Sequence, residues 1–186
     1  MNEQPEPVLQ AVLTRTSALQ LTEPAPTRAE VEELLEAAAT AADHGRLLPW
    51  RLIAITGEDR ARLGTALAEA AVTHEQARRA ATGPLRAPLL LAIILQPVPD
   101  HPKVPEWEQL AAVVGMVTTM SLLLHARGWG SIWRTGPAVA APQVLKYLGL
   151  DDDERLLGWL YIGTRPRAER SLRRLRVETS DRITWR

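Results

Sequence analysis

Few side chains in this 186-residue sequence have the type and spacing to carry out chemistry unaided. There is no cysteine, which excludes thiol nucleophiles and thiolate metal sites, and no G-x-S-x-G turn of a serine hydrolase. The acidic run Asp151-Asp152-Asp153 follows Gly149 and is typical of a solvated turn. None of the histidines stands at metal-site spacing from a second ligand; they are His44, His74, His101 and His125. We therefore predict no metal site, and if the chain is an enzyme, a bound cofactor supplies the reactive group.

The glycine pattern does not predict a dinucleotide-binding fold or a P-loop. The segment Gly128-Trp129-Gly130-Ser131-Ile132-Trp133 begins like the fingerprint G-x-G-x-x-G but ends in tryptophan. It also leads from a predicted helix into a predicted strand, whereas a phosphate-binding loop leads from a strand into a helix. No G-x-x-x-x-G-K-S/T sequence is present either. A doubly wound nucleotide-binding domain is therefore not expected.

Hydrophobic periodicity predicts alternating helices and strands. Thr27 and Glu30 form the capping box of the second helix, and Gly128 stands where a left-handed residue would end the longest one. Strands are predicted at residues 50–56, 88–95, 129–134 and 155–162, and the other helices at 8–15, 58–81, 105–127 and 142–148. The second strand is apolar throughout and should be covered on both faces. This order predicts an α/β or α+β sandwich of a sheet and helices.

Composition predicts one globular domain with no affinity for nucleic acid or membranes. The chain has 46% hydrophobic and 24% charged residues, and its 22 basic residues balance its 22 acidic ones. The N-terminus lacks the basic start and apolar stretch of a signal peptide. The uncharged stretch 110–124 is shorter than the ~20 residues that cross a bilayer. We expect a buried core helix there, and a cytoplasmic protein.

Five short segments, taken together, resemble the nitroreductase family, and within it the short bacterial enzymes of the YdjA type. They are Arg15-Thr16-Ser17, Ala42-Asp43-His44 with Pro49-Trp50-Arg51, Lys103 to Gln109, Gly130 to Gly136, and Leu160 to Thr164. Each segment is weakly specific alone, but the five occur in the right order over roughly residues 8–165. The resemblance implies an α+β fold, with a central, mainly antiparallel sheet flanked by helices. It also implies a homodimer that binds FMN between its subunits.

The resemblance further implies which residues contact the cofactor, with no side chain acting as a catalytic group. A guanidinium suits bidentate contacts with the FMN phosphate, although an arginine after a helix can also simply complement the helix dipole. A histidine could contact the flavin or hydrogen-bond locally, and a tryptophan could pack on the ring or fill the core. The implied contacts are Arg15, Thr16, Ser17, Thr40, His44, Trp133, Arg134 and Thr135.

A further segment matches one that is linked to the nicotinamide nucleotide in relatives. Its apolar pattern is equally typical of helix packing, so both interpretations stay open. The segment consists of Leu123, Leu124, His125, Ala126, Arg127 and Gly128.

Two departures from the family pattern bear on flavin affinity. Many nitroreductases have Asn-x-Gln before the Pro-Trp pair, where this chain has Arg46-Leu47-Leu48. The second arginine of the phosphate tripeptide is replaced by Thr16, which removes one positive charge. If other groups compensate, the nearest are Arg165 and Arg167 after the last predicted strand.

Charge is unevenly distributed along the chain. Residues 165–186 contain eight arginines and three acidic residues, a net charge of +5, which leaves −5 on residues 1–164. A basic tail could bind nucleic acid, but Trp185 is its one aromatic residue, so it has no stacking platform. We interpret residues 1–164 as an FMN-binding domain. Residues 165–186 would be an extension that packs on the acidic body of the partner subunit.

The resemblance implies an FMN-dependent NAD(P)H oxidoreductase. NADH or NADPH would reduce the flavin and leave, and a nitroaromatic, a quinone or a similar flat acceptor would then take the two electrons, a ping-pong scheme. One alternative is a flavin-dependent dehydrogenase or oxidase of an amino-acid-derived substrate. The other is a flavin-binding dimer without catalytic activity.

Overall fold

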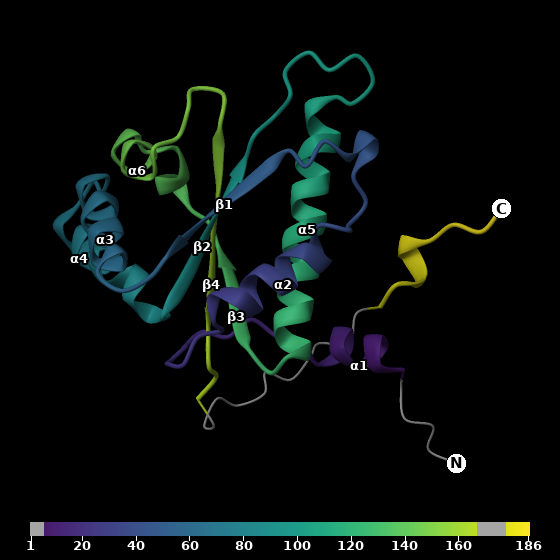
Figure 1. Cartoon of the computed structure of the whole chain (residues 1–186), viewed down its shortest axis with the longest axis horizontal. Helices are drawn as coiled ribbons and strands as arrows, with labels where there is room; N and C mark the ends of the chain where they lie inside the picture. Colours follow the sequence, from purple (N-terminus) through teal and green to yellow (C-terminus); the bar gives the residue numbers. More distant parts are fainter. Residues whose placement is uncertain (1–5, 167–177) are drawn as a thin grey trace.

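The centre of the molecule is a four-stranded antiparallel sheet (Figure 1), in a computed structural model that describes residues 6–166 and 178–186. The strands are β1 (Trp50–Ile55), β2 (Leu89–Leu95), β3 (Gly130–Arg134) and β4 (Arg155–Gly163), and their order across the sheet is β1-β2-β4-β3. Every neighbouring pair is antiparallel. The predicted antiparallel sheet is therefore confirmed, and each strand lies within two residues of its predicted bounds.

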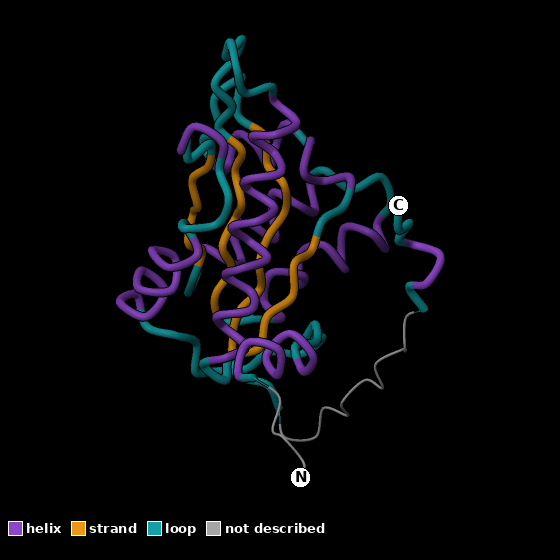
Figure 2. Tube along the Cα trace, turned by 90° about the vertical axis from the view of Figure 1, so that its right-hand side faces the viewer, coloured by secondary structure: helices purple, strands orange, loops and turns teal. Residues whose placement is uncertain are grey.

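Helices cover both faces of this sheet. They are α1 (Pro7–Thr14), α2 (Arg28–Ala38), α3 (Asp59–Glu69), α4 (His74–Thr82), α5 (Glu106–Ala126) and α6 (Pro142–Leu148). Figure 1 shows α2 and α5 on one side of the sheet and α3, α4 and α6 on the other. Figure 2 looks onto the first side, where α5 runs along the strands. The predicted α+β sandwich is confirmed.

The sequence of β2 is apolar without interruption because the strand lies between the two hydrophobic cores of the molecule. Its side chains alternate between two core clusters, one on each face of the sheet. Leu90, Ala92 and Ile94 pack towards α3 and α6, and the odd-numbered residues from Leu89 to Leu95 pack towards α2 and α5. All seven residues are buried. The prediction that both faces are covered is confirmed.

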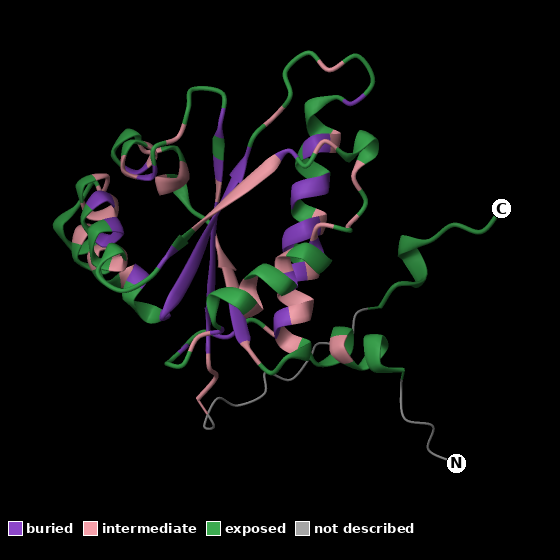
Figure 3. Ribbon diagram, viewed as in Figure 1, coloured by how far each residue is buried: buried purple, intermediate pink, exposed green. Residues whose placement is uncertain are grey.

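The long helix α5 is the core helix that the uncharged stretch predicts. Within the described residues it is the one helix long and apolar enough to cross a membrane. One of its sides, however, is buried against the sheet through residues such as Val113, Met116 and Met120, as the burial colours of Figure 3 show. This packing accounts for its apolar composition.

The single helix predicted at residues 58–81 is wrong, because the structure has two helices there. Helix α3 ends at Glu69, and Thr73 begins α4 with a capping box in which it pairs with Gln76. The chain then folds back so closely that a Cβ on Gly64 would lie 2.2 Å from the carbonyl oxygen of Ala81. The capping-box sequence T-x-x-Q was the signal for this break.

The other local predictions are met in detail. Thr27 and Glu30 form the predicted capping box at the start of α2. Between α2 and β1 the chain forms one short 3-10 turn, His44–Arg46, in which Gly45 and Arg46 have positive φ. Most of the basic tail lies outside the described residues, and residues 178–186 are exposed.

Candidate functional site

Three predicted cofactor residues meet in one cavity of about 220 Å³. Arg15 and Ser17 come from the segment after α1, and Trp133 comes from β3. Hydroxyl groups complete much of the lining. They belong to Thr118 and Ser121 of α5 and to Ser131 of β3, with Ile132 beside them. The cavity therefore lies where α5, β3 and the segment after α1 come together.

Two backbone contacts hold the segment after α1 against the sheet. The amide of Ala18 donates to the carbonyl of Ser131 over 3.0 Å, next to the cavity. Thr22 then forms an isolated antiparallel bridge with Thr164 at the end of β4. Because both partners lie on or beside core strands, the position of the Arg15-to-Ser17 segment is set by the sheet and not by α1 alone.

A second guanidinium lies beside this segment, from beyond the end of β4. Arg165 donates through Nη1 to the hydroxyl of Thr16 over 2.9 Å and through Nη2 to the Thr16 carbonyl over 2.5 Å. Its Nε is buried and has no hydrogen-bond partner. The threonine that replaces an arginine in the family pattern is thus contacted by an arginine from elsewhere in the chain. Arg167 lies outside the described residues.

His125, in the last turn of α5, belongs to the same group. Its Nε2 lies 2.8 Å from the hydroxyl of Thr14. Burial lowers the pKa of the imidazole, and the positive charges of Arg165 and Arg15 lower it further. Because the positive charges of both arginines act on this one imidazole, the region around His125 favours an anion.

The rest of the predicted nucleotide segment is divided between core and surface. Leu124 is fully buried in the core cluster beneath the sheet. Arg127 is exposed and paired with Glu33 of α2, with Nη2 2.5 Å from Oε1. These contacts agree with the helix-packing interpretation for both residues. A nucleotide-binding role for residues 123–128 remains a prediction.

Trp133 and Arg134 point to opposite faces of the sheet, as neighbours on a strand must. The indole N–H of Trp133 donates to the Leu157 carbonyl over 3.2 Å, and its ring packs with the cluster beneath α5. The guanidinium of Arg134 lies over the ring of Tyr161, 5.5 Å from its centroid, in the other cluster. Arg134 and Thr135 line a separate hollow on that face. Within one protomer their side chains therefore do not join Arg15.

Thr40 and His44 form a third group, near the start of α5. Thr40 lines a hollow of about 490 Å³ that Arg46 also lines, so the arginine at the family's departure point stands beside a predicted cofactor residue. His44 Nδ1 lies 2.7 Å from a carboxylate oxygen of Glu108. This is the kind of protein contact that the sequence left open as an alternative to flavin binding.

The first and third groups lie far apart in one chain. Glu108, beside His44, and Ser121, in the Arg15 cavity, are separated by 13 residues of α5. At 1.5 Å per helical residue this is about 20 Å. A single protomer therefore does not bring all the predicted cofactor residues to one place.

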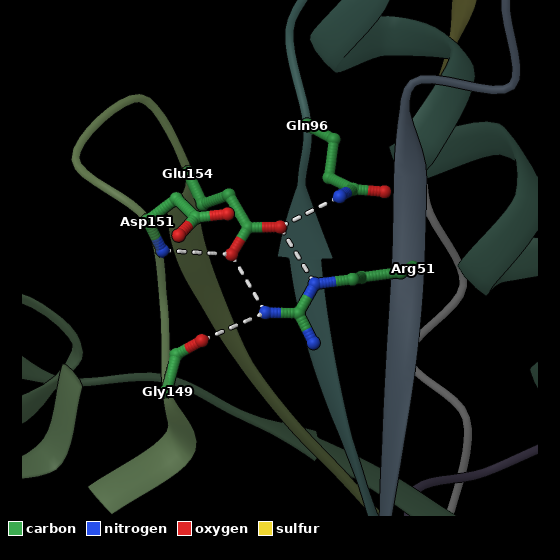
Figure 4. A network of polar contacts seen from close by, with 5 residues as sticks. All are labelled: Arg51, Gln96, Gly149, Asp151 and Glu154. Carbon is green, nitrogen blue, oxygen red and sulfur yellow. Dashed lines mark hydrogen bonds and ion pairs between the residues drawn. The ribbon is translucent and has the colours of Figure 1, made fainter. Parts of the chain in front are cut away.

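The most strongly perturbed carboxyl group lies elsewhere and serves the fold (Figure 4). Glu154 accepts two hydrogen bonds of 2.6 Å from Arg51, one of 2.7 Å from Gln96 and one of 3.0 Å from the Asp151 amide. These bonds, led by those from Arg51, hold the pKa of Glu154 at about 2. Arg51 also donates to the Gly149 carbonyl. The network joins the ends of β1, β2 and β4, and none of its members lines the Arg15 cavity.

Sequence reasoning missed the hydroxyl residues of the cavity. Thr118 and Ser121 are polar residues inside an otherwise apolar helix. Their spacing of three places them on one face of α5, which was the available signal. Ser131 sits within a matched family segment, but nothing in its immediate sequence predicts that it lines a cavity.

Comparison with known proteins connects this architecture to a family. A sequence model of the nitroreductase family matches residues 12–164. The chain is 34% identical over 160 residues to an Escherichia coli K12 protein named "Putative NAD(P)H nitroreductase YdjA", a match that covers 84% of this chain and 87% of that protein.

Two solved structures share the fold. A nitroreductase-like family protein from Bacillus cereus superposes with a TM-score of 0.85 at 23% identity, covering 100% of this chain and 98% of that one. A protein from Desulfovibrio desulfuricans, described as a putative nitroreductase in complex with FMN, gives 0.76 at 21% identity and covers 98% of each chain. These two structures show the fold, and the family match spans most of the sequence. The chain belongs to the nitroreductase family of oxidoreductases.

Proposed function

We propose that this chain is an FMN-dependent oxidoreductase that takes two electrons from NADH or NADPH and passes them to a flat acceptor such as a quinone or a nitroaromatic. The observation that carries the proposal is the cavity at Arg15, Ser17 and Trp133, with the guanidinium of Arg165 beside the same segment of the chain. The description of YdjA as an NAD(P)H nitroreductase and the FMN complex of the Desulfovibrio desulfuricans protein support it.

The residues at this cavity fit the phosphate end of FMN. Arg15 and the hydroxyl of Ser17 line it, and Arg165 has a buried Nε without a partner. Guanidinium groups bind phosphate with charge-assisted hydrogen bonds, and a buried donor without a partner is costly. Arg165 supplies the positive charge that Thr16 lacks. In this proposal Trp133, on the adjoining strand, packs beside the cofactor beyond its phosphate.

One protomer, however, offers too little room for the whole cofactor. Pockets that enclose drug-sized ligands have volumes of about 300–1,000 Å³. The cavity of about 220 Å³ is smaller than this range. We infer that it encloses one end of FMN and that a second protomer covers the remainder.

The outer face of α5 supports such a dimer. Trp107, Leu110 and Val114 form an apolar stripe on this helix, with exposed fractions of 68%, 38% and 39%. The stripe leads to Thr118, which lines the cavity. If two copies pack these helices antiparallel about a two-fold axis, the cavity of one protomer meets the Thr40 and His44 region of the other. This arrangement would reunite the two groups that lie about 20 Å apart in one chain.

The protein's tasks in this proposal are binding and orientation. Bound FMN supplies the redox chemistry, because it can accept two electrons as a hydride and release them to an acceptor. Arg15 and Arg165 hold its phosphate, and the α5 stripe seals the site from one side. Donor and acceptor would use the same open face in turn, so we expect ping-pong kinetics.

Steady-state turnover of the FMN-loaded protein tests this function. With NADPH or NADH as donor and a benzoquinone as acceptor, rates over a grid of concentrations should give parallel double-reciprocal lines. Turnover of an amino-acid-derived substrate with oxygen, without added nucleotide, would favour the oxidase alternative. Bound flavin without turnover of either kind would favour a non-catalytic flavin-binding dimer. Either of the last two results would overturn the proposal.

A further inference from the structure

The contact between His44 and Glu108 uses one side of the imidazole and leaves the other side open. Nδ1 of His44 lies 2.7 Å from Oε2 of Glu108, which stands in the first turn of α5. An ionised carboxylate can only accept a hydrogen bond, so Nδ1 carries a proton and donates it. Among the residues that the structure describes, none forms a hydrogen bond with Nε2 of His44. This nitrogen is therefore available to a ligand.

The backbone of the turn that carries His44 is held by contacts that do not involve Glu108. The carboxylate of Asp43 accepts from the Leu48 amide over 2.7 Å, and the Arg46 amide donates to the Asp43 carbonyl over 3.1 Å. Arg46 and Leu48 have φ of 52° and 46°, values that residues other than glycine rarely adopt. Such conformations persist where the surrounding contacts fix them. The position of the turn is thus set locally.

The first turn of α5, which carries Glu108, is anchored as well. The side chain of the next residue, Gln109, is buried and accepts from the Val98 amide over 2.7 Å. It also donates to the carbonyls of Val98 and Val104 over 3.0 and 3.1 Å. These three hydrogen bonds tie the loop between β2 and α5 to the start of the helix. The carboxylate of Glu108 therefore approaches His44 from a fixed direction.

The contact between the two side chains orients the imidazole more than it stabilises the fold. The side chains of His44 and Glu108 are 57% and 27% exposed. Pairs with this exposure add little to stability, because water competes for both partners. The hydrogen bond to Nδ1 nevertheless selects the tautomer of the ring and fixes its orientation. In the neutral imidazole, Nε2 is then a hydrogen-bond acceptor.

We propose that Glu108 is a positioning residue of the flavin site, which holds His44 so that Nε2 is offered to FMN as an acceptor. This inference rests on the proposed function, in which the His44 region of one protomer meets the Arg15 cavity of the other. Because that cavity holds the phosphate, His44 meets the cofactor beyond its phosphate. FMN carries donors there, the ribityl hydroxyls and the ring N–H, and an acceptor complements them. Glu108 acts through His44 and needs no contact with the cofactor.

The tautomer of His44 can be measured without turnover. In protein labelled with 15N-histidine at pH 8, where an ordinary imidazole is neutral, we expect the proton of His44 on Nδ1, with and without FMN. His44→Ala assigns the signals. Glu108→Ala should abolish this preference. Glu106→Ala should keep it, since Glu106 lies in the same turn of α5 but pairs with Arg155. A proton on Nε2 in the parent, or an unchanged tautomer in Glu108→Ala, would overturn the proposal.

Flavin affinity shows whether this orientation serves the cofactor. His44→Ala and Glu108→Ala should each weaken FMN binding about threefold to tenfold, the effect of one hydrogen bond. The double variant should bind FMN as weakly as His44→Ala alone, because Glu108 acts through the imidazole. Riboflavin binding should weaken by the same factor, since the contact lies away from the phosphate. Glu106→Ala should bind both flavins as the parent does.

The outcomes separate this inference from the proposed function. A parent protein that binds no FMN would overturn both. If the parent binds FMN but the losses add in the double variant, Glu108 acts on the site without His44. If Glu108→Ala keeps the parent's FMN affinity and far-ultraviolet circular dichroism, the orientation of His44 does not serve the cofactor. Either of the last two results would overturn the positioning role and leave the proposed function intact.

Discussion

At the scale of single residues, the contact between Thr16 and Arg165 is the most informative feature. The family pattern has an arginine where this chain has Thr16, and Arg165 reaches that threonine from the end of β4. The sequence allowed this compensation but did not predict its geometry, because the two positions are 149 residues apart. Their contact depends on the Thr22–Thr164 bridge that holds the two segments together.

Arg165→Gln should therefore weaken FMN binding about tenfold or more, since a hydrogen bond to a charged group contributes about 1.5–3 kcal/mol. Riboflavin, which lacks the phosphate, should bind the variant as it binds the parent. Quenching of flavin fluorescence measures both affinities. Arg28→Gln, an exposed arginine of α2, is the matched control. Equal loss of FMN and riboflavin affinity would show that Arg165 acts through the fold and not on the phosphate.

Glu154 predicts a dependence of stability on pH. Its folded-state pKa of about 2 lies below the ordinary value of 4.5, so the ionised form stabilises the fold above pH 4.5. This contribution, about 3 kcal/mol, is lost as the pH falls from 4.5 towards 2. Glu154→Gln should lower the free energy of unfolding by about that amount at pH 7 and flatten this part of the profile. Urea titrations measure the free energy of unfolding, with Glu32→Gln as an exposed control. If the stability of Glu154→Gln still fell steeply between pH 4.5 and 2, the low pKa would not belong to Glu154.

At the scale of elements, α5 combines three tasks. One side is buried beneath the sheet, Thr118 and Ser121 line the cavity proposed for the cofactor, and its outer stripe is apolar and exposed. Sequence periodicity predicted the helix and its burial, since the segment is long and apolar. It could not separate the buried side from the exposed stripe, because both are apolar. The break between α3 and α4 was missed for a similar reason: alanines continue through it and hide the capping box at Thr73.

Val114→Arg should convert the proposed dimer into monomers, because a charge in the middle of an apolar interface leaves a cation without a partner. Multi-angle light scattering after size-exclusion chromatography measures the mass. Val72→Arg is the control, since Val72 is 92% exposed between α3 and α4, away from the stripe. A variant at position 114 that keeps twice the monomer mass would exclude the α5 stripe as the interface.

At the scale of the whole molecule, much of the fold could be predicted and the site only in part. Each strand was predicted because its apolar run is short and bounded by loops or glycine. The matched segments named Arg15, Ser17 and Trp133, which do share a cavity. They could not reveal that Arg134 points to the other face or that His44 pairs with Glu108, since both depend on how distant elements pack.

The basic tail and the acidic body of the chain can attract each other across the dimer. With +5 on residues 165–186 and −5 on the rest of the chain, we expect the tail to bind the acidic body of the partner subunit. Deletion of residues 166–186 should then loosen the dimer at low salt, and the difference from the full chain should shrink at high salt, where the charge contacts of the tail are screened. Light scattering over a dilution series measures the dissociation. An unchanged dimer mass at every concentration would count against this role of the tail.

The visible spectrum of the purified protein under anaerobic conditions tests the central claim most directly. If the chain is an FMN-dependent NAD(P)H oxidoreductase, the protein shows flavin absorbance as isolated or after incubation with FMN. Addition of NADPH or NADH then bleaches that absorbance. A protein that stays colourless after incubation with FMN, or whose bound flavin neither nucleotide reduces, would contradict the account.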